Sequence, residues 1–221
     1  MFILHTPQGD IAFIHIPKTA GMAIRMYLSH VVEKNRITHK EYVGMLGRLD
    51  ASHIPFVHHE KYIKLRNPYY FTCVRNPYDR VYSAYEWVKK TRPATYGKIV
   101  FTIFVTQHLS NIVKVQLHHF NTQANMLANA IHLAPMYLFV TDRQGKQMVT
   151  NVIRQEELNE KSFSKLQQYG LVMDDFKAVG NCHSGAPPKP YEYLKHYTRA
   201  MLDIVNTLYA KDFEMFGYQK K

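Results

Sequence analysis

Two segments of the chain share one succession of residue types. Residues 11–16 and 69–74 are mostly apolar, aromatic or β-branched, as in buried strands. Each run is followed by a short turn that contains a cation, and apolar residues then recur at helical spacing over 23–32 and 78–90. Strand-loop-helix units of this kind cover a sheet with helices, so the pattern predicts an α/β fold with a mainly parallel central sheet.

The length and apolar content predict a single domain. With 221 residues, of which 46% are hydrophobic, the chain can bury one core of ordinary size, and we expect one unit over residues 1–221. A further apolar run predicts a strand at 136–140. The remaining expected elements are helices at 41–49, 99–109, 122–130, 148–154, 162–169 and 193–209, and a loop at 181–190.

The chain is strongly basic. Its 28 lysines and arginines outnumber 17 aspartates and glutamates, which gives a formal net charge of +11 at pH 7. Such a surface attracts anions, which include nucleotides, nucleic acid, acidic glycans and anionic membranes. The sign of the charge does not choose among them.

Cysteine usage and hydropathy bear on location. Cys73 and Cys182 are the only cysteines, too few for a disulfide framework, and nothing in the sequence argues for an oxidising compartment. The N-terminus does not resemble a signal peptide, and no segment reaches the roughly 18 to 20 apolar residues of a transmembrane helix. We therefore expect a soluble, cytoplasmic protein with no membrane anchor.

The first turn, Pro17-Lys18-Thr19-Ala20-Gly21-Met22, has the composition of an anion site. A helix that begins here offers unpaired backbone N–H groups, and its dipole favours negative charge. Lys18 adds a positive charge, Thr19 a hydroxyl, and Gly21 lets the backbone approach a phosphate. The order of residues is not that of a Walker A loop, which weakens a magnesium-dependent nucleotide kinase. The alternative is an ordinary turn with an exposed lysine.

The second turn places Arg75 directly after the strand, where its planar guanidinium could bind a phosphate through two hydrogen bonds. Ser83 follows on the helix and can contribute a hydroxyl. Asp79 and Arg80 have a structural interpretation, a local ion pair that holds the turn with Arg80 packed beneath it.

Together the two segments resemble the sulfotransferases that use 3′-phosphoadenosine-5′-phosphosulfate (PAPS). Residues 13–21, Phe-Ile-His-Ile-Pro-Lys-Thr-Ala-Gly, look like their 5′-phosphosulfate loop, and residues 74–85 look like their 3′-phosphate segment. The match is close to the branch of Golgi glycan O-sulfotransferases and their bacterial and viral relatives. Residues 152–158 and 208–218 look like C-terminal landmarks of that branch, whereas 92–147 are largely unmatched.

The resemblance implies a P-loop kinase-like sulfotransferase architecture and assigns roles to individual residues. Lys18 would contact the bridging and sulfuryl oxygens of the donor, and Arg75 and Ser83 its 3′-phosphate. The 5′-phosphate would lie in the loop formed by Pro17, Lys18, Thr19, Ala20, Gly21, Met22 and Ala23. Met22 departs from the family, whose members usually carry Thr or Ser there, so one hydroxyl donor is missing.

Sulfuryl transfer also needs a base for the acceptor hydroxyl, and histidine is the natural choice near neutral pH. Ser52-His53-Ile54 resembles a Gly-His segment of related glycan sulfotransferases, which favours His53. His39, at the start of an expected helix, is the alternative. A metal site built from His53, His58, His59 and Glu60, or from His118 and His119, lacks any regular ligand spacing, so we expect no metal.

The sequence thus predicts transfer of a sulfuryl group from PAPS to an acceptor hydroxyl on a carbohydrate, with Lys18 and His53 as catalytic residues. One alternative is a relative that binds PAPS or its product PAP without turnover, motivated by Met22. Another is a basic nucleic-acid-binding protein, although no nucleic-acid fold signature supports it.

Overall fold

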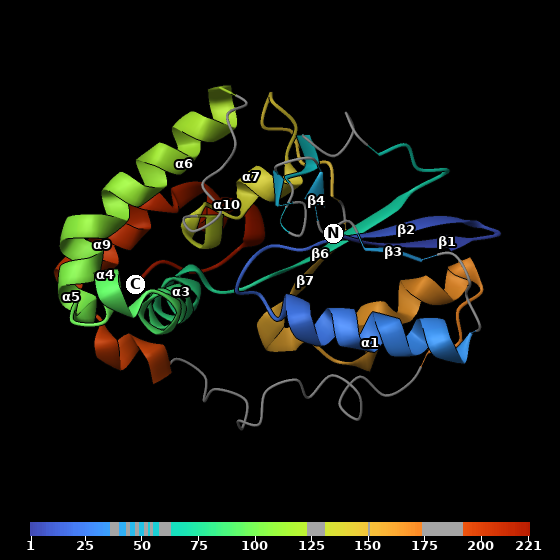
Figure 1. The fold of residues 1–221 in the computed structure, drawn as a ribbon, viewed down its shortest axis with the longest axis horizontal. Coiled ribbons are helices and arrows are strands. Elements are labelled where there is room, and N and C mark those ends of the chain that lie inside the picture. Colours follow the sequence, from blue (N-terminus) through green and yellow to red (C-terminus); the bar gives the residue numbers. More distant parts are fainter. Residues whose placement is uncertain are drawn as a thin grey trace. The chain divides into compact units, whose positions relative to one another are not determined.

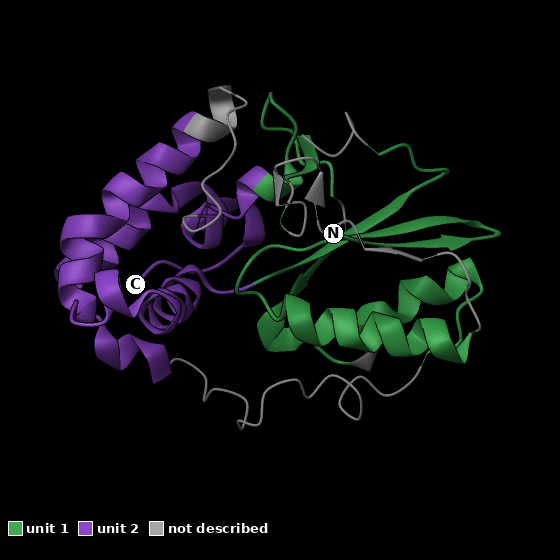
Figure 2. Ribbon diagram, viewed as in Figure 1, with its two compact units in different colours: residues 1–74, 139–186 green, residues 75–138, 187–221 purple. Residues whose placement is uncertain are grey.

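The structure is a computed structural model in two compact units. The described residues are 1–35, 40–42, 45–46, 49–50, 53, 55–57, 63–122, 131–149, 151–173 and 192–221. One unit comprises residues 1–74 and 139–186, and the other comprises residues 75–138 and 187–221 (Figure 2). The single domain expected from the length stays a prediction.

A five-stranded sheet in the order β3-β1-β2-β6-β7 forms the centre of the first unit (Figure 1). Its strands are β1 (Phe2–Thr6), β2 (Gly9–Ile14), β3 (Lys40–Tyr42), β6 (Tyr69–Val74) and β7 (Asn151–Arg154). Strands β2, β6 and β7 run parallel, whereas β1 pairs antiparallel with both β2 and β3. The expected parallel sheet therefore exists where the two predicted loops begin, and two antiparallel strands extend it.

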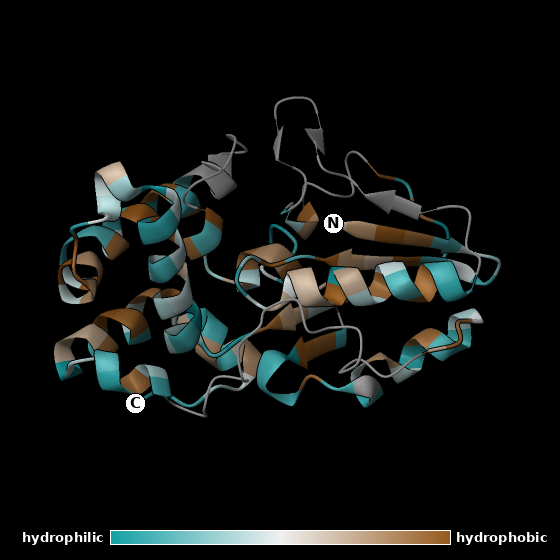
Figure 3. Cartoon of the chain, turned by 60° about the horizontal axis from the view of Figure 1, so that its bottom comes forward, coloured by the Kyte–Doolittle hydropathy of each residue, from teal (hydrophilic) through white to brown (hydrophobic). Residues whose placement is uncertain are grey.

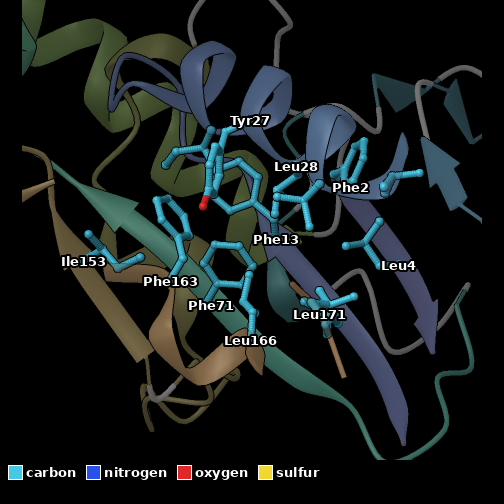
Figure 4. Close-up of a cluster of buried hydrophobic side chains, with 14 of the residues drawn as sticks. Phe2, Leu4, Phe13, Tyr27, Leu28, Phe71, Ile153, Phe163, Leu166 and Leu171 are labelled. Atoms are coloured by element: carbon cyan, nitrogen blue, oxygen red, sulfur yellow. The ribbon is translucent and has the colours of Figure 1, made fainter. Parts of the chain in front are cut away.

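Helix α1 (Gly21–Lys34) packs on this sheet through the face that the sequence predicted. Its buried residues include Ile24, Tyr27, Leu28 and Val31, which recur at helical spacing. They share a core with Phe13 of β2, Phe71 of β6 and Phe163 of the 3₁₀ helix η5 (Glu160–Tyr169) (Figure 4). In Figure 3 the strands are mainly hydrophobic, while α1 carries residues of both kinds. This packing fixes the start of α1 beside the end of β2.

The second unit is helical. Its elements are α3 (Pro77–Thr91), α4 (Pro93–Tyr96), α5 (Phe101–Ile103), the π-helix η2 (Phe104–Leu109), α6 (Ser110–Thr122), η3 (Ile131–Leu133), η6 (Glu192–His196), α9 (Arg199–Leu208) and α10 (Ala210–Phe216). Tyr78 and Tyr85 of α3 pack in its core with Phe104, Met201 and Val205. Among the described residues, none of the helices is long and apolar enough to cross a bilayer.

Two expected helices are strands. Residues 41–49 contain β4 (Met45–Leu46) and β5 (Leu49–Asp50), which pair with each other, and the end of β3. Residues 148–154 contain β7, which pairs with β6. In both places hydrogen bonds to a partner strand override a short periodic signal, which separates helix from strand poorly.

The expected strand at 136–140 is instead the helix α7 (Tyr137–Val140). The side chain of Asp212 accepts hydrogen bonds from the backbone N–H groups of Met136 and Tyr137, at 2.8 and 2.9 Å. A carboxylate in this place caps a helix start and favours helix over strand.

Other expected helices are confirmed with changes. The helix expected at 99–109 begins only at Phe101, after the extended Val100, and continues as the π-helical turn η2. Residues 162–169 lie in the 3₁₀ helix η5, which ends at the left-handed Gly170. Over 193–209, Thr198 interrupts the helix with an extended backbone and caps α9. The expected helix at 122–130 (beyond Thr122) and the loop at 181–190 lie outside the described residues.

Candidate functional site

The loop after β2 has an unusual backbone. Lys18 and Ala20 have φ values of 68° and 64°, whereas Pro17, Thr19 and Gly21 are not among the described residues with positive φ. An alternation of left- and right-handed residues turns successive backbone N–H groups toward one concave side, which is the geometry of an anion-binding nest. A left-handed backbone costs a residue with a side chain about 1 to 2 kcal/mol. Two such residues within one loop point to a functional constraint.

Helix α1 begins directly after this loop without a side-chain cap. Ala20 occupies the N-cap position and makes no side-chain hydrogen bond, and the first turn contains no acidic residue. The backbone N–H groups of the first turn thus have neither an N-cap side chain nor a nearby carboxylate to satisfy them. Lys18 is partly buried in the same loop and adds its charge to the positive end of the helix.

Thr19 has a role that differs from the expectation. Its side chain is fully buried, and its hydroxyl donates a hydrogen bond to the carbonyl oxygen of Ile16 at 2.9 Å. A hydroxyl has one hydrogen to donate, so this one folds the loop and only the backbone N–H of Thr19 remains for an anion. Met22, the second residue of α1, is 50% exposed.

Gly21 makes room for His15. A Cβ atom placed on Gly21 would lie 1.9 Å from both Cδ2 and Nε2 of the His15 ring. The sequence interpretation assigned this glycine to the approach of a phosphate, whereas the structure shows that its missing side chain is replaced by an imidazole. His15 is buried at 8% exposure and stacks on Phe13, with ring centroids 5.7 Å apart.

His53 lies next to the same histidine. Its Nδ1 is 3.0 Å from the carbonyl oxygen of His15, and the two ring centroids are 4.4 Å apart at an interplanar angle of 60°. A carbonyl oxygen can only accept, so Nδ1 of His53 carries the hydrogen and the lone pair of the neutral ring is on Nε2. The structure therefore brings His53 and the end of β2 together. His39 lies outside the described residues.

The sequence reasoning missed His15. It directly follows β2 and lies two residues before Pro17, inside the quoted motif. A polar aromatic residue at the carboxyl end of a buried strand, directly before a loop, was the available signal. Its partners could not be named without the tertiary contacts.

The turn after β6 is closed by its own side chains. Asn76 accepts a hydrogen bond from the backbone N–H of Tyr78 at 3.1 Å, and Pro77 occupies the first turn of α3. Asp79 Oδ2 is 2.7 Å from Nε of Arg75, and both side chains are 13% exposed. Ser83, partly buried, follows Asp79 by one helical turn on the same face.

The expected ion pair between Asp79 and Arg80 is wrong. Asp79 pairs with Arg75, and Arg80 is buried at 1% exposure with Nη1 donating to the carbonyl oxygen of Ala134 at 2.8 Å. Burial raises the pKa of Asp212 to about 6, against the opposing effects of Arg80 and two backbone amides. Arg80 thus opposes the rise in the pKa of Asp212 through its charge, and it is buried in the second unit as the structural interpretation expected.

The proposed donor-binding residues divide between the two units. Residues 17–23 and His53 belong to the first unit, and Arg75 and Ser83 to the second, with the division at the peptide bond between Val74 and Arg75. Within the described ranges, no group of three or more His, Cys, Asp or Glu side chains is placed to hold a metal ion. His58, His59 and Glu60 lie outside those ranges.

Comparisons with known proteins address the family directly. A family model described as "Sulfotransferase family" matches residues 2–219, which covers nearly the whole chain and both units. Neither a curated protein nor a solved structure matched the chain. A match of this extent shows that the chain belongs to the sulfotransferase family.

Proposed function

We propose that the protein transfers a sulfuryl group from PAPS to an acceptor hydroxyl on a carbohydrate. Sulfuryl transfer in general follows from membership of the sulfotransferase family. The observation that carries the finer proposal is the uncapped loop at residues 17–21, with left-handed Lys18 and Ala20, next to the ring system of His15 and His53. An anion cradle and a base in one unit are the two parts that the reaction needs.

Each unit carries a turn whose residues suit one phosphate of such a donor. The loop offers backbone N–H groups, the charge of Lys18 and no competing carboxylate in the first turn of α1. The second turn offers a guanidinium that Asp79 orients through Nε, together with the hydroxyl of Ser83 on the same helical face.

The proposed chemistry assigns one task to each group. When bound, the donor supplies a sulfuryl group, whose S–O bond to the 5′-phosphate breaks as a new S–O bond to the acceptor oxygen forms. His53 takes the acceptor's proton at Nε2, the ring atom left with the lone pair by the bond from Nδ1 to the His15 carbonyl. Lys18 and the loop amides stabilise the negative charge that collects on the leaving phosphate.

The carbohydrate acceptor rests on the resemblance of residues 13–21 and 74–85 to the glycan O-sulfotransferase branch and on the net charge of +11. Met22 supports a second candidate function, a relative that binds PAPS or PAP without turnover. Its half-exposed thioether side chain supplies no hydrogen-bond donor at a position where a hydroxyl is usual in the family.

Calorimetry with PAP at moderate salt and turnover assays with sulfur-labelled PAPS test the proposal. We expect wild type to bind PAP without added metal and to label a hydroxyl of at least one carbohydrate in an acceptor panel. PAP binding without labelling of any sugar, lipid or phenol would favour the binding-only relative. Absence of PAP binding, with a steep salt dependence of binding to DNA or RNA, would refute the proposal and favour nucleic-acid binding.

A further inference from the structure

His15 occupies a constrained place between two parts of the proposed site. Its imidazole fills the space where a side chain of Gly21 would be, at the first residue of α1. On another side it stacks on Phe13 at an interplanar angle of 20°. With 8% exposure, the ring has little freedom to move without shifting the start of the helix.

The same residue also contacts His53. The His53 ring meets the His15 ring edge-on, and its Nδ1–H donates to the His15 carbonyl oxygen. Residue 53 is separated from residue 15 by 38 positions, so these two contacts are tertiary. A ring neighbour and a backbone acceptor together define both the position and the tautomer of an imidazole.

We propose that His15 is a positioning residue that holds His53 in register with the anion loop, an inference that rests on the proposed function. Its ring contacts the first residue of α1, which follows the loop directly, and its ring and carbonyl contact the base. A displacement of about 1 Å between reacting groups can cost about 100-fold in rate, so a rigid link of this kind affects turnover more than donor binding. The imidazole of His15 itself touches no reacting atom in this assignment.

Gly21→Ala provides the first arm of the test. The backbone of Gly21 is not left-handed, and alanine is the better helix former, so intrinsic propensity predicts stabilisation. The His15 ring predicts the opposite, because the new Cβ would lie 1.9 Å from it. We expect a lower melting temperature and PAP affinity at least about 10-fold weaker, since the loop must move away from the ring.

His15→Ala provides the second arm. We expect PAP affinity within about 3-fold of wild type and kcat lower by about 10- to 100-fold, the usual cost of losing an orienting partner. His15→Asn keeps part of the ring edge and is expected to recover much of kcat. His30→Ala, a histidine further along α1, serves as the matched control and is expected to turn over like wild type.

The double variant His15→Ala/Gly21→Ala separates packing from catalysis. Removing the ring makes room for the Cβ, so PAP affinity and melting temperature should return toward those of His15→Ala, while kcat stays low. Additive losses in the double variant, or turnover of His15→Ala equal to that of wild type, would overturn the inference. Absence of PAP binding and turnover in wild type would refute the proposed function instead, and melting temperatures would still report the contact between His15 and Gly21.

Discussion

The loop after β2 and the loop after β6 begin their helices in opposite ways. The first has no side-chain cap, two left-handed residues that are not glycine, and no acid in the first turn of α1. The second is capped by Asn76, begins with Pro77 and carries Asp79 in the first turn of α3. One helix N-terminus is therefore open to an anion through its backbone, and the other is satisfied by its own side chains.

This difference changes the interpretation of two similar sequence patterns. Both segments have an apolar run, a cation and a helix, and both looked alike as phosphate sites. The first can bind through main-chain N–H groups together with Lys18, whereas the second can bind only through side chains such as Arg75 and Ser83. A backbone cradle suits the reacting end of a ligand, where charge develops in the transition state, and paired side chains suit anchoring.

Lys18→Met is expected to give the largest effect on turnover. Loss of the charge at the open loop should lower kcat by about 100- to 1000-fold, the typical cost of one donor to a developing negative charge. PAP affinity should fall much less, because the backbone cradle remains. Turnover with labelled PAPS and calorimetry with PAP measure the two quantities. Lys34→Met at the other end of α1 is the control. An unchanged kcat in Lys18→Met would contradict the assignment of the loop after β2 to the reacting end of the donor.

Arg80→Met tests how the second unit supports α3. Removing the countercharge of a buried carboxylate typically costs about 3 to 5 kcal/mol. Folding raises the pKa of Asp212 from 3.8 to about 6. The contribution of Asp212 to folding stability is therefore fully present below pH 3.8, and it is lost as the pH rises through about 6. Without Arg80 the pKa rises further, and the destabilisation should be larger at about pH 8 than at about pH 5.

Urea denaturation at the two pH values measures this effect. Adding Asp212→Asn to Arg80→Met should remove this pH dependence, because the Asp212 carboxyl is then no longer present to titrate. A destabilisation that is independent of pH in Arg80→Met would show that Asp212 is not its electrostatic partner.

Arg75→Ala should weaken binding rather than chemistry. Loss of a charge-assisted hydrogen bond costs about 1.5 to 3 kcal/mol, which corresponds to PAP affinity lower by about 10- to 100-fold. At saturating donor, kcat should stay within about 3-fold of wild type, because the lost contact stabilises the bound donor and the transition state equally. Asp79→Asn should cause a smaller loss of affinity, because it removes only the negative charge beside Nε and keeps a side-chain oxygen that can accept its hydrogen bond. A fall in kcat equal to that of Lys18→Met would contradict the assignment of Arg75 to donor anchoring and of Lys18 to the transition state.

Asn76→Ala should affect stability alone. The cap of α3 is worth about 1 kcal/mol, measurable by chemical denaturation. Because this N-terminus is proposed to bind through side chains, PAP affinity should stay the same. Weaker PAP binding would indicate that the backbone of the second turn takes part in recognition.

Met22→Thr should give the smallest effect, a gain. A hydroxyl at the start of α1 adds one hydrogen-bond donor, and a net contribution of about 0.5 to 1 kcal/mol corresponds to a kcat about 3-fold higher. Met22→Leu keeps an apolar side chain and should leave kcat unchanged. Equal kcat in the threonine and leucine variants would show that the missing hydroxyl does not limit turnover.

Much of the fold near the candidate site was predictable from sequence. The strands at 11–16 and 69–74 and the helices that follow them are confirmed within two or three residues. Strong apolar periodicity and turn residues mark these elements, because burial of one face decides local structure there. The predictions failed at 41–49, 136–140 and 148–154, where the elements are short and partners distant in sequence decide between helix and strand.

By itself the sequence determined which strands and loops exist and where their cations stand. Arg75 follows its strand directly and Lys18 lies in the short loop after its strand, so their placement depends only on local succession. The tertiary structure decided which side chains meet: His15 against Gly21, His53 against His15, and Asp79 with Arg75 rather than Arg80. A sequence pattern reports which faces are buried, whereas side-chain partners depend on loop conformation and on packing between distant segments.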